Sequence, residues 1–268
     1  MDGGMIFELN KKYSDYGEYA VQYDQSLIDN LYKNYIKLGC KFITTCNYCF
    51  KPSKLKEWEK YTKLAVDLVQ KYRNDVKVFG CIPPFFDSYK NGNVNEDFIS
   101  FYQKLCNIMK NKIDIYLIET SVSINHVSKI YEIIKKIDPD AKIIVSLYPN
   151  SKNEEDISKY FDLDLYGLFL NCCSFNKVID FHDKFIKKCS KINDINTFGF
   201  NCNKINEKEY SKNCNIKQLQ NFKKNKTINR LSLNNFIQTL DYENIYIGGC
   251  CGYGVKEMEE LINEIIPS

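Results

Sequence analysis

The residues best suited to chemistry in this 268-residue sequence are two pairs of adjacent cysteines, Cys172-Cys173 and Cys250-Cys251. Each pair ends an apolar run, LYGLFLNCC and NIYIGGCC, which is typical of the carboxyl end of a buried β-strand. Three cysteine thiolates with an open fourth position would make a zinc site that can receive a substrate. The spacing of the pairs alone favours buried structural cysteines, because only tertiary folding could bring the thiols together.

The strand geometry limits which of these thiols can share a pocket. Adjacent residues of a strand point to opposite faces, so one of Cys172 and Cys173 should face the pocket and the other should face away. The same alternation argues against Cys250 and Cys251 both binding one metal. The two glycines before that pair weaken the objection, since they let the chain leave the pleat so that both cysteines can turn inward.

The elements that must position these cysteines alternate along the chain. Short, nearly continuous apolar runs suited to parallel strands begin near Met1, Lys41, Val76, Asp114, Ala141, Leu165, Ile195 and Asn244. Stretches of helical period separate nearly all of them, at 26–38, 55–72, 96–109, 124–137, 154–160, 175–189 and 255–266. Eight such units predict an α/β fold, a (β/α)₈ TIM barrel forming a single domain over residues 1–268.

Three parts of this prediction carry alternatives. A doubly wound open sheet is the competing fold, but no Gly-rich phosphate loop follows the first strand. Only Met1 precedes the DGG turn, so the first strand is expected to be a stub, through either a late start of the chain or a damaged strand. Residues 203–230, polar and rich in Asn and Lys, predict a lid or a loose surface insertion.

The composition narrows the class of partner. The sequence is 44% hydrophobic with a net charge of +3, and its lysines are scattered, so no nucleic-acid or anionic membrane surface is indicated. No apolar run is long enough to span a membrane, and the start MDGGMIFELNKK is unlike a signal peptide. These features predict a cytoplasmic protein with reduced thiols that binds small soluble molecules. They leave the oligomeric state open.

A barrel of this kind gathers the carboxyl ends of its strands into one pocket. The strand ends place Thr120 and Asn201 there, together with the candidates for binding a substrate, which are Asp2, Gly3, Thr45, Glu119 and Asn171. Glu119 would also suit a general base, although a carboxylate at a strand end is as often a plain binding or structural group. The histidines His126 and His182 fall in helical stretches outside the barrel, where surface or interface roles outweigh metal binding.

Six segments, in this order over nearly the whole chain, resemble the homocysteine S-methyltransferase family: DGGM, LGCKFITTCNY, GCIPPF, YLIET, FLNCC and IYIGGCCG. The GGCC end is the most specific part of the resemblance. The resemblance implies a (β/α)₈ barrel in which Cys172, Cys250 and Cys251 hold zinc while Asp2 and Glu119 help to hold homocysteine. The chain departs from the family where TTCNY stands for a TTNTY-like stretch and GCIPP for GSIGP, which alters the surroundings of the pocket.

The activity implied by this resemblance is zinc-dependent transfer of a methyl group to the thiol of homocysteine, giving methionine. S-methylmethionine or S-adenosylmethionine is the expected donor. One alternative is the same barrel with another thiol acceptor, or with a corrinoid-linked donor module on a separate chain. Another is a non-catalytic interaction module whose zinc is closed in by all four of Cys172, Cys173, Cys250 and Cys251.

Overall fold

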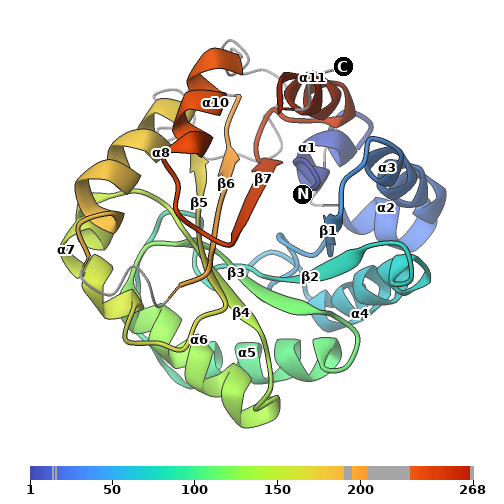
Figure 1. The fold of residues 1–268 in the computed structure, drawn as a ribbon. Helices are drawn as coiled ribbons and strands as arrows, with labels where there is room; N and C mark the ends of the chain where they lie inside the picture. Colours follow the sequence, from blue (N-terminus) through green and yellow to red (C-terminus); the bar gives the residue numbers. More distant parts are fainter. Residues whose placement is uncertain (14, 16, 190–194, 205–229, 266–268) are drawn as a thin grey trace.

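A computed structural model describes residues 1–13, 15, 17–189, 195–204 and 230–265. Seven parallel strands follow one another in chain order across one curled sheet: β1 (Phe42–Thr44), β2 (Lys77–Ile82), β3 (Ile115–Ser121), β4 (Ile143–Leu147), β5 (Gly167–Cys173), β6 (Thr197–Cys202) and β7 (Asn244–Gly249). The helices of the described part lie around the outside of the sheet (Figure 1). This is the TIM-barrel-like architecture that the alternation predicts.

The helices described are α1 (Met5–Leu9), α2 (Glu18–Tyr23), α3 (Gln25–Lys37), α4 (Trp58–Val69), α5 (Glu96–Met109), α6 (Ile124–Ile137), α7 (Ser151–Tyr160), α8 (Phe175–Phe181), α10 (Arg230–Gln238) and α11 (Val255–Ile265). A 3₁₀ turn, η1 (Gln70–Tyr72), extends α4, and a π-helical turn, η2 (His182–Ile186), extends α8. None of the described helices is both long and apolar enough to cross a lipid bilayer. Of the expected lid or insertion at 203–230, residues 205–229 lie outside the described part.

The strand expected at Met1 is not formed, and the apolar run Met5–Leu9 is helix α1 instead. Met1 and Asp2 nevertheless bridge the gap between β7 and β1, where the N-terminus lies in Figure 1. The Met1 amino group donates to the Ile247 carbonyl at 2.9 Å, and the Gly249 N–H donates to the Asp2 carbonyl at 3.2 Å. On the other side, the Asp2 carboxylate accepts the N–H and the hydroxyl of Thr44 at 2.7 and 2.9 Å.

Two layers of apolar side chains hold the barrel together. The large outer layer packs the helices against the sheet, and a smaller cluster fills the inside of the curl. The buried members of the inner cluster are Phe79, Ile115, Leu117, Ile144 and Phe169. The ring centroids of Phe42 in β1 and Tyr246 in β7 lie 4.6 Å apart. An aromatic contact therefore links the two edge strands of the sheet, which are not paired with each other by hydrogen bonds. The inner cluster forms the floor beneath the strand ends.

β3 and β5 each lose register near their carboxyl ends. Thr120 and Cys172 lie at these irregularities with positive φ angles, 53° and 57°. Side chains other than glycine, and β-branched ones above all, rarely adopt this conformation. A bulge next to a binding site re-aims a side chain that the regular pleat would direct elsewhere. The two bulges therefore decide which side chains of these strands enter the pocket.

The surface or interface role expected for His182 is wrong. His182 in η2 is only 2% exposed, and its ring packs against Phe198 and Phe236. Its Nε2 lies 3.2 Å from the Tyr242 hydroxyl. Burial lowers the pKa of the ring, which favours the neutral form. The histidine is thus part of the aromatic packing between the helical layer and β6.

The Asp2 bridge leads to a prediction about stability. Asp2→Ala removes the acceptor of both Thr44 bonds, and each hydrogen bond to a charged group contributes about 1.5 to 3 kcal/mol. Burial raises the pKa of Asp2 to about 6, so desolvation of the carboxylate offsets part of this gain. We therefore expect the free energy of unfolding to fall by about 1 to 2 kcal/mol, measured by urea denaturation. The exposed Asp75→Ala serves as control and should change it by less than about 0.5 kcal/mol. Equal stability of the two variants would mean that the bridge does not hold the sheet edges together.

Candidate functional site

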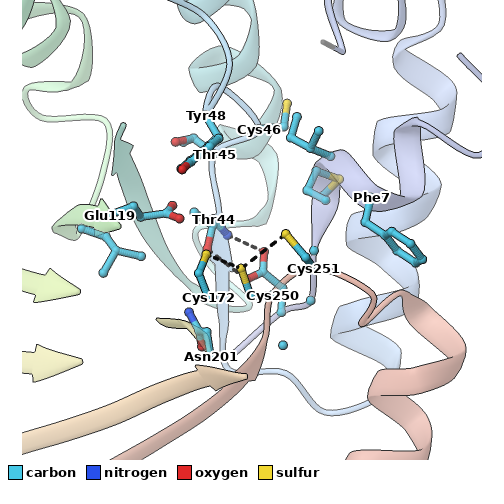
Figure 2. A pocket seen from close by; sticks show the side chains of 17 residues that line it. Phe7, Thr44, Thr45, Cys46, Tyr48, Glu119, Cys172, Asn201, Cys250 and Cys251 are labelled. Carbon is cyan, nitrogen blue, oxygen red and sulfur yellow. Dashed lines mark hydrogen bonds between the residues drawn. The ribbon is translucent and has the colours of Figure 1, made fainter. Parts of the chain in front are cut away.

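A pocket opens at the carboxyl ends of the strands, on the side of the barrel where this fold places its chemistry. Residues from the N-terminal segment, β1, β3, β5, β6 and the turn after β7 line it: Asp2, Gly3, Gly4, Met5, Ile6, Phe7, Thr44, Thr45, Cys46, Tyr48, Leu117, Glu119, Cys172, Asn201, Gly249, Cys250 and Cys251. Most of the residues singled out from the sequence are therefore neighbours. Figure 2 shows the three cysteines together on one wall and Glu119 on another.

The three cysteines form a contiguous group of sulfur atoms. Cys172 Sγ lies 3.0 Å from Cys250 Sγ, and Cys250 Sγ lies 4.0 Å from Cys251 Sγ. No disulfide joins the cysteines of the described part. Tertiary folding thus brings together thiols from β5 and from the turn after β7. Their separation in the sequence alone does not indicate this proximity.

The β5 bulge selects Cys172 for the pocket. Phe169 and Asn171 point inward on the regular alternation of β5, which would send Cys173 inward next and Cys172 outward. The positive φ of Cys172 reverses this order. Cys173 packs in the outer apolar layer and is fully buried there, while Cys172 lines the pocket.

The chain leaves β7 before the second pair, and this lets both cysteines reach the pocket. β7 ends at Gly249, where a Cβ atom would come within 2.2 Å of the Tyr253 side chain, so only glycine allows so close a turn. The Cys250 N–H donates to the Cys202 carbonyl at 2.9 Å. The Cys251 N–H donates to Asn203 Oδ1 at 3.1 Å, which fixes the turn against the end of β6.

Two thiols of this group, those of Cys172 and Cys250, hold their protons at neutral pH. The pKa of Cys172 is raised to about 12, because its interaction with Cys251 and its burial outweigh the hydrogen bond with Cys250 that lowers it. Hydrogen bonds with both neighbours, together with burial, raise the pKa of Cys250. A cluster of this kind becomes anionic only when a cation compensates the charge.

The donor set matches a zinc ion in chemistry and nearly in spacing. Three sulfur ligands at about 2.3 Å from zinc in tetrahedral geometry stand about 3.8 Å apart. The 4.0 Å pair is close to this spacing, whereas the 3.0 Å pair would have to open by less than about 1 Å. As they stand, the described residues include no group of three His, Cys, Asp or Glu side chains already arranged around a metal. The three thiols are the residues that would hold one.

Glu119 extends its carboxylate from β3 into the space between the cysteines and Thr45 (Figure 2). Burial raises its pKa to about 8, with smaller contributions from Cys172 and Asp2, while a hydrogen bond with Cys81 lowers it. A carboxyl group this poorly solvated gains from a cationic partner that enters the pocket. The position suits binding of an ammonium group.

The other sequence candidates divide into two groups. Asp2, Gly3 and Thr45 line the pocket, but both Asp2 oxygens are engaged by Thr44, and Thr45 Oγ1 donates to Asn47 Oδ1 at 2.6 Å. Asn171 does not line it; the side chain is buried beneath the cysteines, where Nδ2 donates to Thr120 Oγ1 at 3.1 Å. Asn171 therefore supports the site from below.

Two polar residues that the sequence places at strand ends, but to which it assigns no role, belong to the site. Asn201 from β6 lines the pocket, and its Oδ1 is buried without a hydrogen-bond partner among the described residues. Thr120 lies directly behind Cys172 and is fully buried. Asn201 precedes a strand-end cysteine as Asn171 does, and Thr120 follows Glu119, so their strand-end positions were the available signal.

A family profile and two solved structures of homocysteine methyltransferases match this chain. A sequence profile of the family described as homocysteine S-methyltransferase matches residues 1–265. The fold resembles the homocysteine methyltransferase MmuM from Escherichia coli in its metallated form, with a TM-score of 0.67 and 15% identity over 98% of this chain and 94% of that one. The oxidized form gives a TM-score of 0.69 and 16% identity over 97% and 93% of the two chains. The search of curated proteins gave no match.

Proposed function

The chain belongs to the homocysteine S-methyltransferase family, and we propose that it transfers a methyl group to the thiol of homocysteine, giving methionine, with zinc held by Cys172, Cys250 and Cys251. The observation that carries the proposal is the convergence of these three thiols at the barrel mouth, facing the half-buried carboxyl group of Glu119. The metallated state of the related MmuM structure supports the assignment of a metal.

The chemistry requires a thiolate at neutral pH. A free thiol with a pKa near 8.5 is mostly protonated there, and zinc, when bound, supplies the positive charge that keeps the thiol of homocysteine deprotonated. The homocysteine sulfur then forms a bond to the methyl carbon of the donor. The bond from that carbon to the donor sulfur breaks, and its electron pair returns to the donor, which leaves as a neutral thioether. The released thiol proton passes to solvent.

The residues of the pocket orient this transfer. Glu119 would hold the ammonium group of homocysteine, so that its thiol points toward the cysteines. S-methylmethionine and S-adenosylmethionine both carry a sulfonium cation, and Tyr48 is the pocket aromatic that we expect to contact it. A reducing compartment such as the cytosol belongs to the proposal, because oxidised thiols would not bind zinc.

The alternatives differ in their support. The closed four-cysteine site would need Cys173, which packs in the outer apolar layer and does not line the pocket. A barrel that keeps zinc only for structure therefore has no fourth thiol from these two pairs. Another small thiol as acceptor would use the same cysteines and differ only in what Glu119 contacts.

An activity panel tests the proposal. Reduced protein loaded with zinc should convert homocysteine to methionine with S-methylmethionine or S-adenosylmethionine, followed by mass spectrometry. Removal of zinc with a chelator should abolish the reaction, and added zinc should restore it. Turnover of another thiol but not of homocysteine would replace the acceptor, and a protein that takes up no zinc would refute the mechanism.

A further inference from the structure

Thr120 lies next to Cys172 in an arrangement that costs both residues their preferred backbone conformation. Their φ angles are 53° and 57°, at the bulges of β3 and β5, and β4 lies between the two strands. Because of these bulges Thr120 Oγ1 lies 3.7 Å from Cys172 Sγ, within hydrogen-bond distance for sulfur. Strained backbone is retained where the surrounding structure enforces it, which is commonly at functional sites.

The hydrogen bonds around Thr120 fix the direction in which its hydroxyl donates. A hydroxyl group has one proton and two lone pairs. The Tyr48 hydroxyl donates to Thr120 Oγ1 at 3.1 Å, and Asn171 Nδ2 donates to the same oxygen at 3.1 Å. Both lone pairs are therefore occupied, and the Thr120 proton is left for Cys172.

The chain of donors continues behind Tyr48. The Tyr48 hydroxyl is 2.8 Å from Ser88 Oγ, and since the Tyr48 proton is used on Thr120, Ser88 must donate in this pair. The order of donation is Ser88 to Tyr48 to Thr120 to Cys172. Hydrogen bonds in such a chain polarise one another, and the last one strengthens when its acceptor is an anion. The chain thus ends on the sulfur that would be a thiolate in the metal-loaded protein.

We propose that Thr120 is a positioning residue of the metal site, whose hydroxyl fixes the orientation of Cys172 Sγ and withdraws electron density from it. The inference rests on the proposed function, because it assumes that Cys172 binds the metal. A thiolate that accepts a hydrogen bond is a weaker nucleophile than one that does not. The Cys172 sulfur is thereby made less nucleophilic than the substrate sulfur, which must accept the methyl group.

Three variants separate the hydroxyl from the shape of the side chain. Thr120→Val removes the hydroxyl but keeps the branched shape, and Thr120→Ser keeps the hydroxyl. The matched control is Thr62→Val in α4, because Thr62 is also fully buried and its hydroxyl has no partner among the described residues. Zinc affinity is measured by chelator competition, without substrate. We expect about tenfold weaker binding for Thr120→Val and near-parental binding for the other two.

A second readout reports on the sulfur itself. Protein loaded with Co²⁺ in place of zinc shows a charge-transfer band from thiolate to metal, whose energy depends on electron density at sulfur. Thr120→Val should move this band to longer wavelength, and Thr120→Ser should leave it in place. A merely structural role would reduce the intensity of the band but not move it. Tyr48→Phe, which cuts the chain one bond earlier, should move it in the same direction by less.

The outcomes are distinguishable. An unchanged affinity and an unchanged band in Thr120→Val, with parental protein that binds metal, would overturn the role of Thr120 and leave the proposed function intact. Parental protein that binds neither Zn²⁺ nor Co²⁺ would overturn both. Should Thr120→Val fail to fold, the band of Tyr48→Phe decides: a shift supports the donor chain, and no shift refutes it.

Discussion

Cys250→Ser is expected to release the bound zinc and to slow methyl transfer by on the order of a thousandfold or more. The central sulfur of the group is lost, and the remaining two thiols lie on either side of it. Without the metal only a few per cent of a substrate thiol is thiolate at pH 7, and its orientation toward the donor is lost as well. Zinc is measured by atomic emission, and turnover by the methionine formed.

The adjacent cysteines of β5 provide a control that differs by one position. Cys172→Ala should lose zinc as Cys250→Ser does, whereas Cys173→Ala should retain both metal and activity, because Cys173 packs in the outer apolar layer. Alanine is chosen in both so that no hydroxyl is buried. Equal loss of zinc in the two variants would instead favour the closed site of four cysteines.

Glu119→Ala is expected to weaken homocysteine binding by about thirtyfold or more while zinc stays bound. The carboxylate is the partner that we assign to the substrate ammonium, and truncation leaves that charge unpaired in a poorly solvated pocket. Calorimetric titration of homocysteine at equal zinc occupancy measures the effect. Parental affinity in this variant would contradict the assignment, and loss of zinc would show that the barrel mouth had collapsed.

The raised pKa of Glu119 adds a pH dependence to the same experiment. Burial, foremost, raises this pKa to about 8, so below pH 8 the group is protonated in the empty pocket and must lose its proton to pair with an ammonium. Homocysteine affinity should therefore increase from pH 6 to pH 8 and level off above. Glu119→Gln keeps the shape of the side chain but does not titrate. The difference between the pH profiles of the parental protein and this variant therefore separates the titration of Glu119 from that of the substrate thiol.

Elements with a strong helical period were predictable from the sequence. The stretches 96–109 and 124–137 match α5 and α6 residue for residue. Asn95 caps the start of α5 by accepting from the Phe98 N–H, and Asp138-Pro139 ends the second stretch. The start of the chain was not predictable in this way, because a short apolar run such as Met5–Leu9 fits a strand and a helix equally well.

Which of the candidate residues lie together was more predictable than how they are arranged. The resemblance to the family selected Cys172, Cys250 and Cys251, which the structure brings together. The alternation of a strand left open whether Cys172 or Cys173 faces the pocket, because a bulge depends on the register between neighbouring strands and leaves no periodic trace in the sequence. The contact of Thr120 with Cys172 could not be predicted for the same reason, since it exists only through two bulges.

The Met1–Gly4 segment couples closure of the sheet to the state of the thiols. Gly4 packs so closely on the turn after β7 that an added Cβ would come within 2.6 Å of the Cys250 carbonyl, and the Gly4 N–H donates to the Tyr253 carbonyl at 2.7 Å. The same segment joins β7 to β1. We call this junction between β7 and β1 the seam. In the proposed enzyme, metal binding and opening of the seam are therefore linked equilibria. Each tenfold gain in metal affinity of the closed form over the open form stabilises the seam by about 1.4 kcal/mol at saturating metal.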